Sequence, residues 1–432
     1  MTSATGPKIP YYQYSIKTIW ISLKAIFTSS AGFRCLSSLW GIFQEAFIWS
    51  EAPSHAAIRQ WLMKLGLFKL QQTHKDGKWM LIVDSTIQMG SQKVLLVLGV
   101  CLDKLKNTCI PSFKDAEPLI MKIVESCPGE VIERAILDAK EKIGDIYGIV
   151  SDAGSEMKKG MRLLSESGQN TIHVFDIVHL ISNLLKNNLK DDEDWLLYKQ
   201  QSMNMIQVVK LSAFAHLAPP RQRAKERLMA STTIIEWGLK FLAHVDFLDS
   251  QKNEIDLKLI WILKFRNQLN IWKQLLCLGK LALELVHEQG YHAQISMEWN
   301  KIISAMDINN SRISAFAESI KTLLQREGDK IIKGEYCLGS SVIIESAFGK
   351  FKQLEGHHAS SGITSLVLAL PAIFGETDDS ELANALNSIS LKDLDDWQNK
   401  NLGQTYLSKR KMTLKPLQND LDSCEYNNYQ TA

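Results

Sequence analysis

Residues 147–160, YGIVSDAGSEMKKG, decide the fold of this chain. The first residues form a short apolar run, typical of a buried strand, and the run stops at Asp152. A glycine and a lysine-rich helix predicted over residues 155–167 follow at once. One carboxylate at a strand end means little, but several carboxylates converging on a metal would indicate chemistry on phosphates.

The segments around this stretch repeat the alternation of strand and helix. Strands are predicted at residues 78–86, 93–103, 108–113, 146–152 and 171–176. Gly90 lies between the first two, which indicates a hairpin. Helices are predicted at residues 130–144, 155–167 and 177–189. This order predicts an α/β fold, with a mixed five-stranded sheet and helices on its faces.

The N-terminal region, residues 10–75, has the pattern of helices. In SHAAIRQWLMKLGLFKL (54–70), Ser54 is the expected cap and Gly66 the expected stop. Arg59 and Lys64 are expected on the exposed side of this helix. It is either the second helix of a helix-turn-helix or part of a small packing bundle.

The region between residues 190 and about 335 contains almost no strand-like segment and is rich in tryptophan. Tryptophan at helical spacing is usually core, although it also stacks on bases. Trp237 and Trp299 have the fewest apolar neighbours in the sequence and are the expected exceptions. A new helix is expected to begin at Ser340 or Ser341.

The predicted domain organisation follows from these segments. The C-terminal part turns polar after Gly375, and residues 417–432 have the composition of a disordered tail. We predict a helical region that is a candidate DNA-binding region, a catalytic core in two pieces, an all-α insertion domain and a polar tail. The candidate DNA-binding region covers residues 1–76. The two pieces of the catalytic core cover residues 77–190 and 336–375, and the insertion domain lies between them at residues 191–335. The polar tail covers residues 376–432.

The bulk composition excludes several classes of protein. A net charge of +2 over 432 residues is too small to indicate a nucleic-acid partner by itself, so any basic surface that binds nucleic acid must be local. Seven scattered cysteines without a CxxC pair indicate reduced thiols in a cytosolic protein. No signal peptide or membrane span is expected. The absence of a GxSxG elbow and of a P-loop argues against a serine hydrolase and against ATP hydrolysis.

Three carboxylates stand out by position. Asp84 and Asp152 end the first and fourth predicted strands, and Glu345 lies among apolar residues of a predicted helix. Mg²⁺ prefers oxygen ligands, and two such ions clamp the attacking and leaving oxygens of a displacement at phosphorus. Any one of these residues alone is more often a helix cap or a solvated strand end, and the positions of all three together favour a metal site.

The order of these elements and motifs resembles that of the DDE transposases, a ribonuclease-H-like superfamily, and in particular bacterial insertion-sequence transposases. VDST (83–86) is similar to the first aspartate motif and SDAGSEMKKG (151–160) to the second. ESAFGKFK (345–352) is similar to the glutamate helix, with Lys352 at the family's lysine position. The arginine and tyrosine that precede the glutamate in the family are replaced here by Ser341 and Leu338. The resemblance implies that Asp84, Asp152 and Glu345 hold two Mg²⁺ ions, for which Mn²⁺ can substitute.

A second likeness concerns HVFDIVH (173–179). Mutator-like and hAT-like transposases, which carry a helical insertion, have a Cys/Asp-x-x-His pair at this place, and Asp176 and His179 match it. The resemblance implies that the pair supports the reaction near the cleaved phosphate. The alternative is a helix-capping aspartate and a half-buried histidine. The insertion would also account for the 193 positions that separate Asp152 from Glu345.

The function that the sequence favours is a Mg²⁺-dependent transposase that cuts DNA at transposon ends and joins it to target DNA. Its partners would be double-stranded DNA and further copies of the chain, without a membrane, in the bacterial cytoplasm at the nucleoid or in a eukaryotic nucleus. The alternatives are a nuclease or resolvase without strand transfer and a catalytically inactive DNA-binding descendant. The candidate DNA contacts are basic side chains that serve equally well as solvated helix surface: Lys158, Lys159, Arg221, Arg223, Lys225, Arg227 and Lys352.

Overall fold

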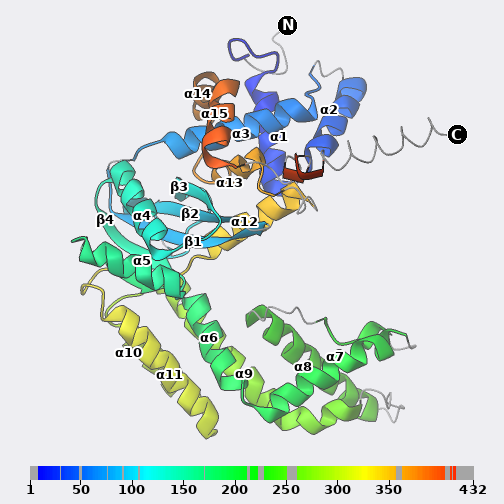
Figure 1. The fold of residues 1–432 in the computed structure, drawn as a ribbon. Helices are drawn as coiled ribbons and strands as arrows, with labels where there is room; N and C mark the ends of the chain where they lie inside the picture. The colour runs from blue at the N-terminus through cyan, green and yellow to red at the C-terminus, as the bar shows by residue number, and fades with distance from the viewer. Residues whose placement is uncertain are drawn as a thin grey trace, which may run out of the picture. The chain divides into compact units, whose positions relative to one another are not determined.

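The chain divides into two compact units in the computed structural model (Figure 1). The first comprises Met1–Asn107, Pro111–His173 and Ser341–Ala432, and the second Thr108–Ile110 and Val174–Ser340. The structure describes residues 8–29, 31–47, 51–74, 76–89, 92–105, 108–169, 171–211, 215–221, 228–250, 260–356, 362–403, 409–410 and 412–414. In this described part, no helix combines the length and the apolar character that crossing a bilayer requires.

A five-stranded sheet with the order β3-β2-β1-β4-β5 is the centre of the fold. Its strands are β1 (Trp79–Met89), β2 (Gln92–Cys101), β3 (Ala116–Val124), β4 (Ile146–Ser151) and β5 (Ile172–Phe175). β2 pairs antiparallel with both β1 and β3, whereas β4 pairs parallel with β1. The predicted mixed five-stranded sheet with flanking helices, N-terminal helices and a helical region after the sheet is confirmed.

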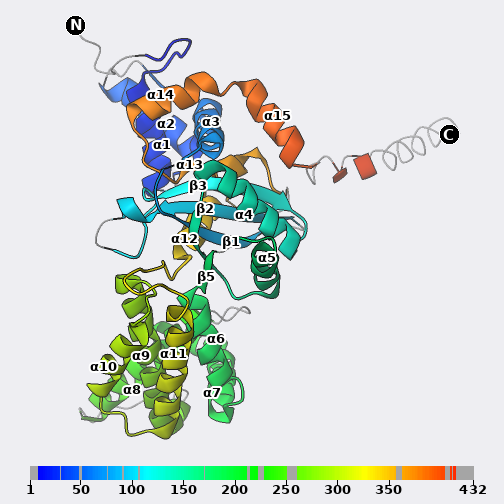
Figure 2. The same cartoon turned by 90° about the vertical axis from the view of Figure 1, so that its left-hand side faces the viewer.

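Helices cover both faces of the sheet. On one face, α4 (Gly129–Ile143) and α5 (Ser155–Glu166) bury Ile132, Ile136 and Met157 in one apolar cluster with Leu81 and Val83 of β1 and further residues of the sheet. On the other face, α12 (Val342–Glu355) packs against β1, as Figure 2 shows. Strand side chains alternate between faces, so the β1 positions next to Leu81 and Val83 face α12.

The strand predicted at residues 108–113 is wrong. Residues 108–115 form bends and turns, and the third strand is β3. Pro118 argues against a central strand, because proline has no N–H to donate. β3 lies at the edge of the sheet, and its pairing with β2 shifts register near Pro118, between Val97 and Leu98 of β2. An edge strand accommodates the missing donor, which the sequence pattern alone did not reveal.

The N-terminal helices α1 (Ile16–Ser29), α2 (Phe33–Phe47) and α3 (His55–Gln71) belong to the first unit. Ser54 caps α3 as predicted. The stop predicted at Gly66 is wrong, because α3 continues to Gln71 and Gly66 lies against the backbone of Leu368.

Arg59 and Lys64 are half-buried, so the prediction that they lie on an exposed face of α3 is also wrong. Arg59 donates to Ser365 Oγ at 3.3 Å, and Lys64 donates to the Tyr12 hydroxyl at 2.7 Å. Both side chains therefore hold α3 to neighbouring segments of its own unit.

The polar segment after Gly375 folds in part. α14 (Asp379–Ser388) packs on α1 and α3 with Leu382, Ala385 and Leu386 buried, and α15 (Leu391–Asn401) begins with a capping box of Ser390 and Asp393. The short helix α13 (Ala369–Ala372) also packs on α3. Residues 417–432, expected to be disordered, lie outside the described residues.

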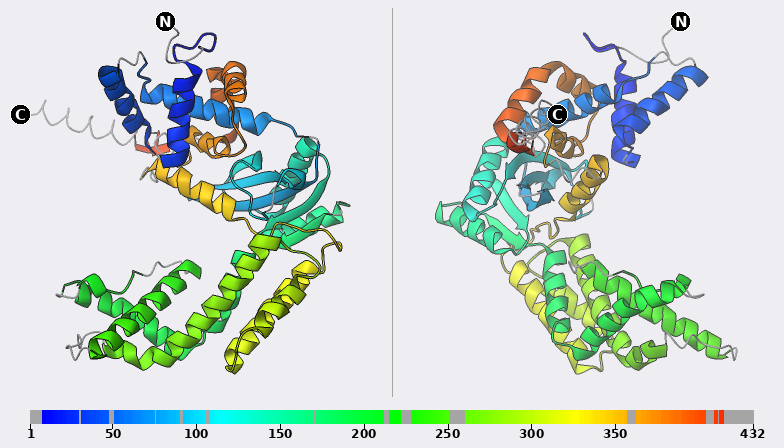
Figure 3. Two further views of the ribbon diagram at one scale, coloured as in Figure 1. Left: turned by 180° about the vertical axis from the view of Figure 1, so that it is seen from behind. Right: turned by 45° about the vertical axis from the view of Figure 1, so that its right-hand side comes forward.

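The second unit is helical in its described part, apart from the end of β5 and one bridge between Tyr291 and Cys337 (Figure 3). Its helices are α6 (Ile177–Leu189), α7 (Glu193–Lys210), α8 (Leu228–Ser250), α9 (Arg266–Gln289), α10 (Ile295–Ser304) and α11 (Ser311–Gly328). α9 packs against α6, α8 and α11.

The tryptophans of the second unit are mainly core. Trp195 and Trp272 are buried and stack edge to face at 5.1 Å. The expectation that Trp299 is poorly enclosed is wrong: it is 1% exposed and donates to the Ala317 carbonyl at 3.0 Å. Trp237 is half-buried and donates to the Leu217 carbonyl.

Glu355, at the end of α12, gives the first testable prediction. It is 5% exposed, its oxygens have no hydrogen-bond partner among the described residues, and burial raises the pKa of its carboxyl from 4.5 to about 7. As pH rises, the unfolded chain loses this proton first, so the free energy of unfolding is expected to fall between about pH 4.5 and 7. The loss is about 1–2 kcal/mol after solvent screening.

Glu355→Gln is therefore expected to be more stable than wild type at pH 8 and nearly equal to it at pH 4. Urea midpoints at the two pH values measure this difference. Glu141→Gln, a change of an exposed glutamate on α4, is the matched control and should leave the pH dependence unaltered. A wild-type pH dependence that persists in Glu355→Gln contradicts the assignment.

Candidate catalytic carboxylates

Asp84 and Asp152 occupy adjacent positions on neighbouring parallel strands. In the register of β1 and β4, Val83 pairs with Ser151, and each aspartate is the next residue of its chain. Neighbouring strands lie about 4.8 Å apart, so the two aspartates stand side by side where the paired part of the strands ends. The parallel pairing joins two motifs that are 68 positions apart in the sequence (152 − 84).

The two aspartates have different surroundings. Asp84 is 1% exposed, lies on the face of β1 toward α12, and its Oδ1 accepts from the Ser85 backbone N–H at 2.6 Å. Asp152 is half-buried, and its Oδ1 accepts from the Gly154 backbone N–H at 3.1 Å, which shapes the turn into α5. Backbone N–H groups thus orient both carboxylates.

Glu345 lies in the first turn of α12. Ile344, Ala347, Phe348 and Phe351 form the buried stripe of this helix, and Glu345 is half-buried at its margin. Since α12 packs on β1, its apolar stripe holds the helix on the face of the sheet to which Asp84 belongs. That Glu345 converges with the two aspartates stays a prediction.

The donor set fits a divalent metal in chemistry, because Mg²⁺ binds through one or two carboxylates together with substrate phosphates. Asp84, inside β1, and Asp152, directly after the neighbouring strand β4, supply that pair. Within the described residues, no three histidine, cysteine, aspartate or glutamate side chains are grouped closely enough to hold a metal by themselves. A metal here would therefore need oxygen ligands beyond the protein, and phosphate oxygens of a substrate are of the right type.

Sequence reasoning missed the neighbours of Asp152. Ser151 is fully buried, its Oγ lies 2.9 Å from His173 Nε2 of β5, and it also donates to the Asp152 carbonyl at 3.1 Å. This pair connects the strand end that carries Asp152 to the next strand. The signal was present as a serine near the end of one predicted strand and a histidine inside the next, but only the pairing of β4 with β5 brings them together.

Cys127 is a second neighbour that the sequence did not indicate. Burial raises the pKa of its thiol, and the negative charges of Glu156 and Asp152 act in the same direction. The thiol is thus held protonated at neutral pH, so it is a poor metal ligand or nucleophile.

Asp176 and His179 belong to the second unit. Asp176 is 1% exposed and caps α6, since its Oδ1 accepts from the backbone N–H groups of Val178 and His179 at 2.6 and 3.2 Å. The capping alternative for Asp176 is therefore observed, and His179 is half-buried. A supporting role in the reaction stays a prediction for both.

The candidate DNA-contacting residues differ in their exposure and in their partners. Lys352 is exposed on α12, two helical turns after Glu345, and Lys158 and Arg221 are also exposed. Lys159 forms an ion pair with Glu130 at 2.7 Å, and this hydrogen bond raises the pKa of the lysine. Arg223, Lys225 and Arg227 lie outside the described residues.

No family model matches the chain, and no curated protein matches it. The fold is similar to a solved structure described as a Drosophila P element transposase strand transfer complex, with a TM-score of 0.40, 13% sequence identity, and coverage of 87% of this chain and 93% of that chain. At this level the likeness assigns neither family nor activity, and nothing in it supports a transposase of the bacterial insertion-sequence type.

Proposed function

We propose that the chain is a metal-dependent DNA transposase, in which Asp84, Asp152 and Glu345 are the catalytic carboxylates. The observation that carries this proposal is the parallel register of β1 and β4, which sets the two aspartates next to each other. The packing of α12 on β1 supports the inclusion of Glu345. A mixed sheet that sets two aspartates next to each other on inner strands suits metal-assisted chemistry on phosphates.

Two Mg²⁺ ions held by these carboxylates would supply charge stabilisation for a displacement at phosphorus, and Mn²⁺ can replace them. The protein's own contribution is to orient ligands. Ser85 and Gly154 fix one oxygen of each aspartate through backbone N–H groups. The contact between the buried Ser151 and the half-buried His173 holds the end of β4 in place.

The test of this function uses DNA that the chain would be expected to recognise. A plasmid carrying the genomic DNA from both sides of the gene is incubated with the protein and a second, target plasmid. With Mg²⁺ or Mn²⁺, we expect strand cleavage at the flanks and joined products, whereas Ca²⁺, which tolerates looser geometry, should not support cleavage. Cleavage that persists in excess chelator excludes the proposal.

The same assay separates the alternatives. Cleavage without joined products indicates a nuclease or resolvase. Binding without cleavage under any metal indicates an inactive DNA-binding descendant. Two-fold or higher assembly on DNA, expected of a transposase that joins two ends, is measured by light scattering of the complex.

Lys352→Ala tests how DNA meets α12. The exposed lysine is expected to neutralise one phosphate, so its removal should weaken binding and lower the slope of log affinity against log salt by about 0.9. Lys392→Ala removes the same charge from the exposed surface of α15 and is the matched control. Fluorescence anisotropy over a salt series gives both slopes. Equal slopes for the two variants would exclude Lys352 as a phosphate contact.

A further inference from the structure

A cleft of about 400 Å³ in the first unit is not part of the candidate catalytic site. Four segments form it: α1, the loop between β2 and β3, α12, and the chain that follows α13. Its volume is within the range of about 300–1,000 Å³ that is typical of sites for small ligands. It is too small for a DNA duplex but large enough for one nucleotide.

The lining of this cleft combines aromatic rings with lysines. Three rings line it, from Trp20, Phe27 and Phe113. Lys24, Lys114 and Lys350 supply positive charge, and Glu376 is the carboxylate in the lining. The formal charge of the lining is therefore +2 (three lysines less one glutamate). Lys24 and Lys114 are exposed, and neither forms an ion pair in the part of the chain that the structure describes.

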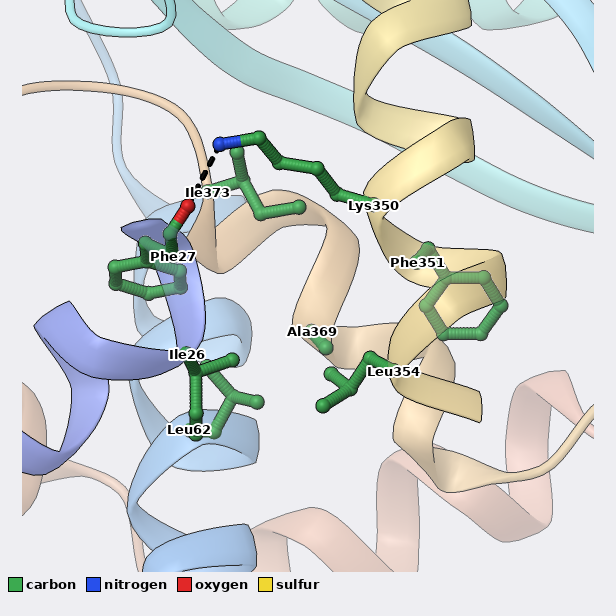
Figure 4. Close-up of a pocket in the computed structure, with 8 residues that line it drawn as sticks. All are labelled: Ile26, Phe27, Leu62, Lys350, Phe351, Leu354, Ala369 and Ile373. Carbon is green, nitrogen blue, oxygen red and sulfur yellow. Dashed lines mark hydrogen bonds between the residues drawn. The ribbon is translucent and has the colours of Figure 1, made fainter. Parts of the chain in front are cut away.

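The walls of the cleft are fixed by specific contacts. Lys350 Nζ donates to the Phe27 carbonyl at 2.6 Å, as Figure 4 shows, and lies 4.9 Å from the centre of the Phe113 ring. Next to Lys350, the side chains of Phe27, Phe351 and Ile373 line a small apolar cavity.

The loop between β2 and β3 is equally well held. Ser112 and Asp115 close a turn through hydrogen bonds of 2.8 and 2.5 Å, and Gly375 N–H donates to the Phe113 carbonyl at 2.8 Å. The Phe113 ring packs edge to face on Phe374 at 5.7 Å. These contacts hold the turn that carries Phe113 and Lys114, two of the residues that line the cleft.

We infer that this cleft binds one unpaired nucleotide of a DNA strand, with the base against Trp20 and Phe113 and the adjoining phosphates at Lys24 and Lys114. Aromatic side chains bind every base through its ring face, and lysines track the phosphates on either side. The location agrees with a strand, because Lys350 is five residues after Glu345 on α12, about 7.5 Å along the helix axis. The choice of DNA as the source of the nucleotide rests on the proposed function, whereas recognition of a nucleotide does not.

The experiment measures binding without chemistry. Fluorescence anisotropy in EDTA compares two fluorescein-labelled duplexes that differ only in a three-nucleotide single-stranded overhang. Wild type is expected to bind the overhang duplex about tenfold more tightly, the factor that one stacked base provides. Lys24→Glu with Lys114→Glu, and separately Trp20→Leu, should abolish this preference and leave blunt-duplex binding within about threefold of wild type.

Lys17→Glu is the matched control, since Lys17 is an exposed lysine of α1 outside the cleft lining. It should retain the preference. Lys24 and Lys114 are exposed, so the lysine variant is expected to fold. It therefore tests the inference even if Trp20→Leu does not fold.

The other outcomes separate the cleft inference from the proposed catalytic function. A preference that survives both cleft variants, or no preference in wild type, removes the cleft as a strand site and leaves the cleavage test unaffected. Thymidine 5′-monophosphate that binds the cleft at micromolar concentration, without any overhang preference, indicates a site for a free nucleotide. Loss of the preference in the cleft variants, in a chain that never cleaves DNA, supports the cleft and rejects the catalytic function.

Discussion

Asp84→Asn is expected to reduce strand cleavage and joining more than about 100-fold while DNA affinity stays nearly unchanged. Asparagine has the shape of aspartate and keeps an oxygen that accepts from the Ser85 N–H, so this hydrogen bond is retained. It loses the negative charge that a divalent metal requires. Affinity comes mainly from lysine and arginine contacts to phosphates, which this change does not touch.

The same result is expected for Asp152→Asn and Glu345→Gln, which complete the proposed set. Gel-shift titration and the plasmid cleavage assay, performed on the same preparations, separate binding from chemistry. Asp145→Asn is the matched control because Asp145 is exposed and directly precedes β4, at the opposite end of the strand from Asp152. It should cut at the wild-type rate.

A carboxylate variant that cuts at near the wild-type rate is not a metal ligand. Glu345 is where such a result would be least surprising, because its place rests on the packing of α12 rather than on strand register. Loss of activity in Asp145→Asn would point to a general loss of folding and would remove the support that the three variants give.

The sheet was predictable from local pattern because its strands are apolar runs bounded by turns. Asp152 could be placed at a strand end, directly after β4. The prediction that Asp84 ends its strand is wrong, because β1 continues to Met89, and the register of β1 and β4 is what makes the two aspartates neighbours. β3 was misplaced because Pro118 argued against a strand at its position. Proline is accommodated there because β3 is an edge strand, which only the sheet order shows. The helix α14 was missed because Leu382 and Leu386 are buried by α1 and α3, not by a long apolar run of their own.

The parts of the site that escaped prediction depend on contacts between distant segments. Ser151 meets His173 across two strands, and the cleft at Lys350 is assembled from four segments. No periodicity in the sequence carries such information. Trp299 was misjudged for the same reason, since α11 covers it with residues that are adjacent only in space.

Gly66→Ala should destabilise the first unit, although alanine is the better helix former. In an exposed helix interior, glycine to alanine adds about 0.5–1 kcal/mol of stability. At Gly66 the added Cβ would overlap the Leu368 carbonyl and lie 3.3 Å from Pro371 Cγ. Overpacking of this kind costs about 1–3 kcal/mol, and backbone atoms cannot swing aside as a flexible side chain would.

Gly66→Ala is informative because its expected effect on stability is opposite in sign to that of the same change at an exposed helical glycine. Hydrogen exchange of the α3 amides measures the local free energy of opening, and these amides should exchange about 5- to 100-fold faster in the variant. Gly349→Ala is the matched control: Gly349 is an exposed glycine inside α12, and a Cβ added there would meet nothing within 4 Å, so this variant should be slightly stabilised. If Gly66→Ala were stabilised as well, α3 and the segment at Leu368 would not be in close contact. The N-terminal helices would then lack the close approach that joins them to the chain after α12.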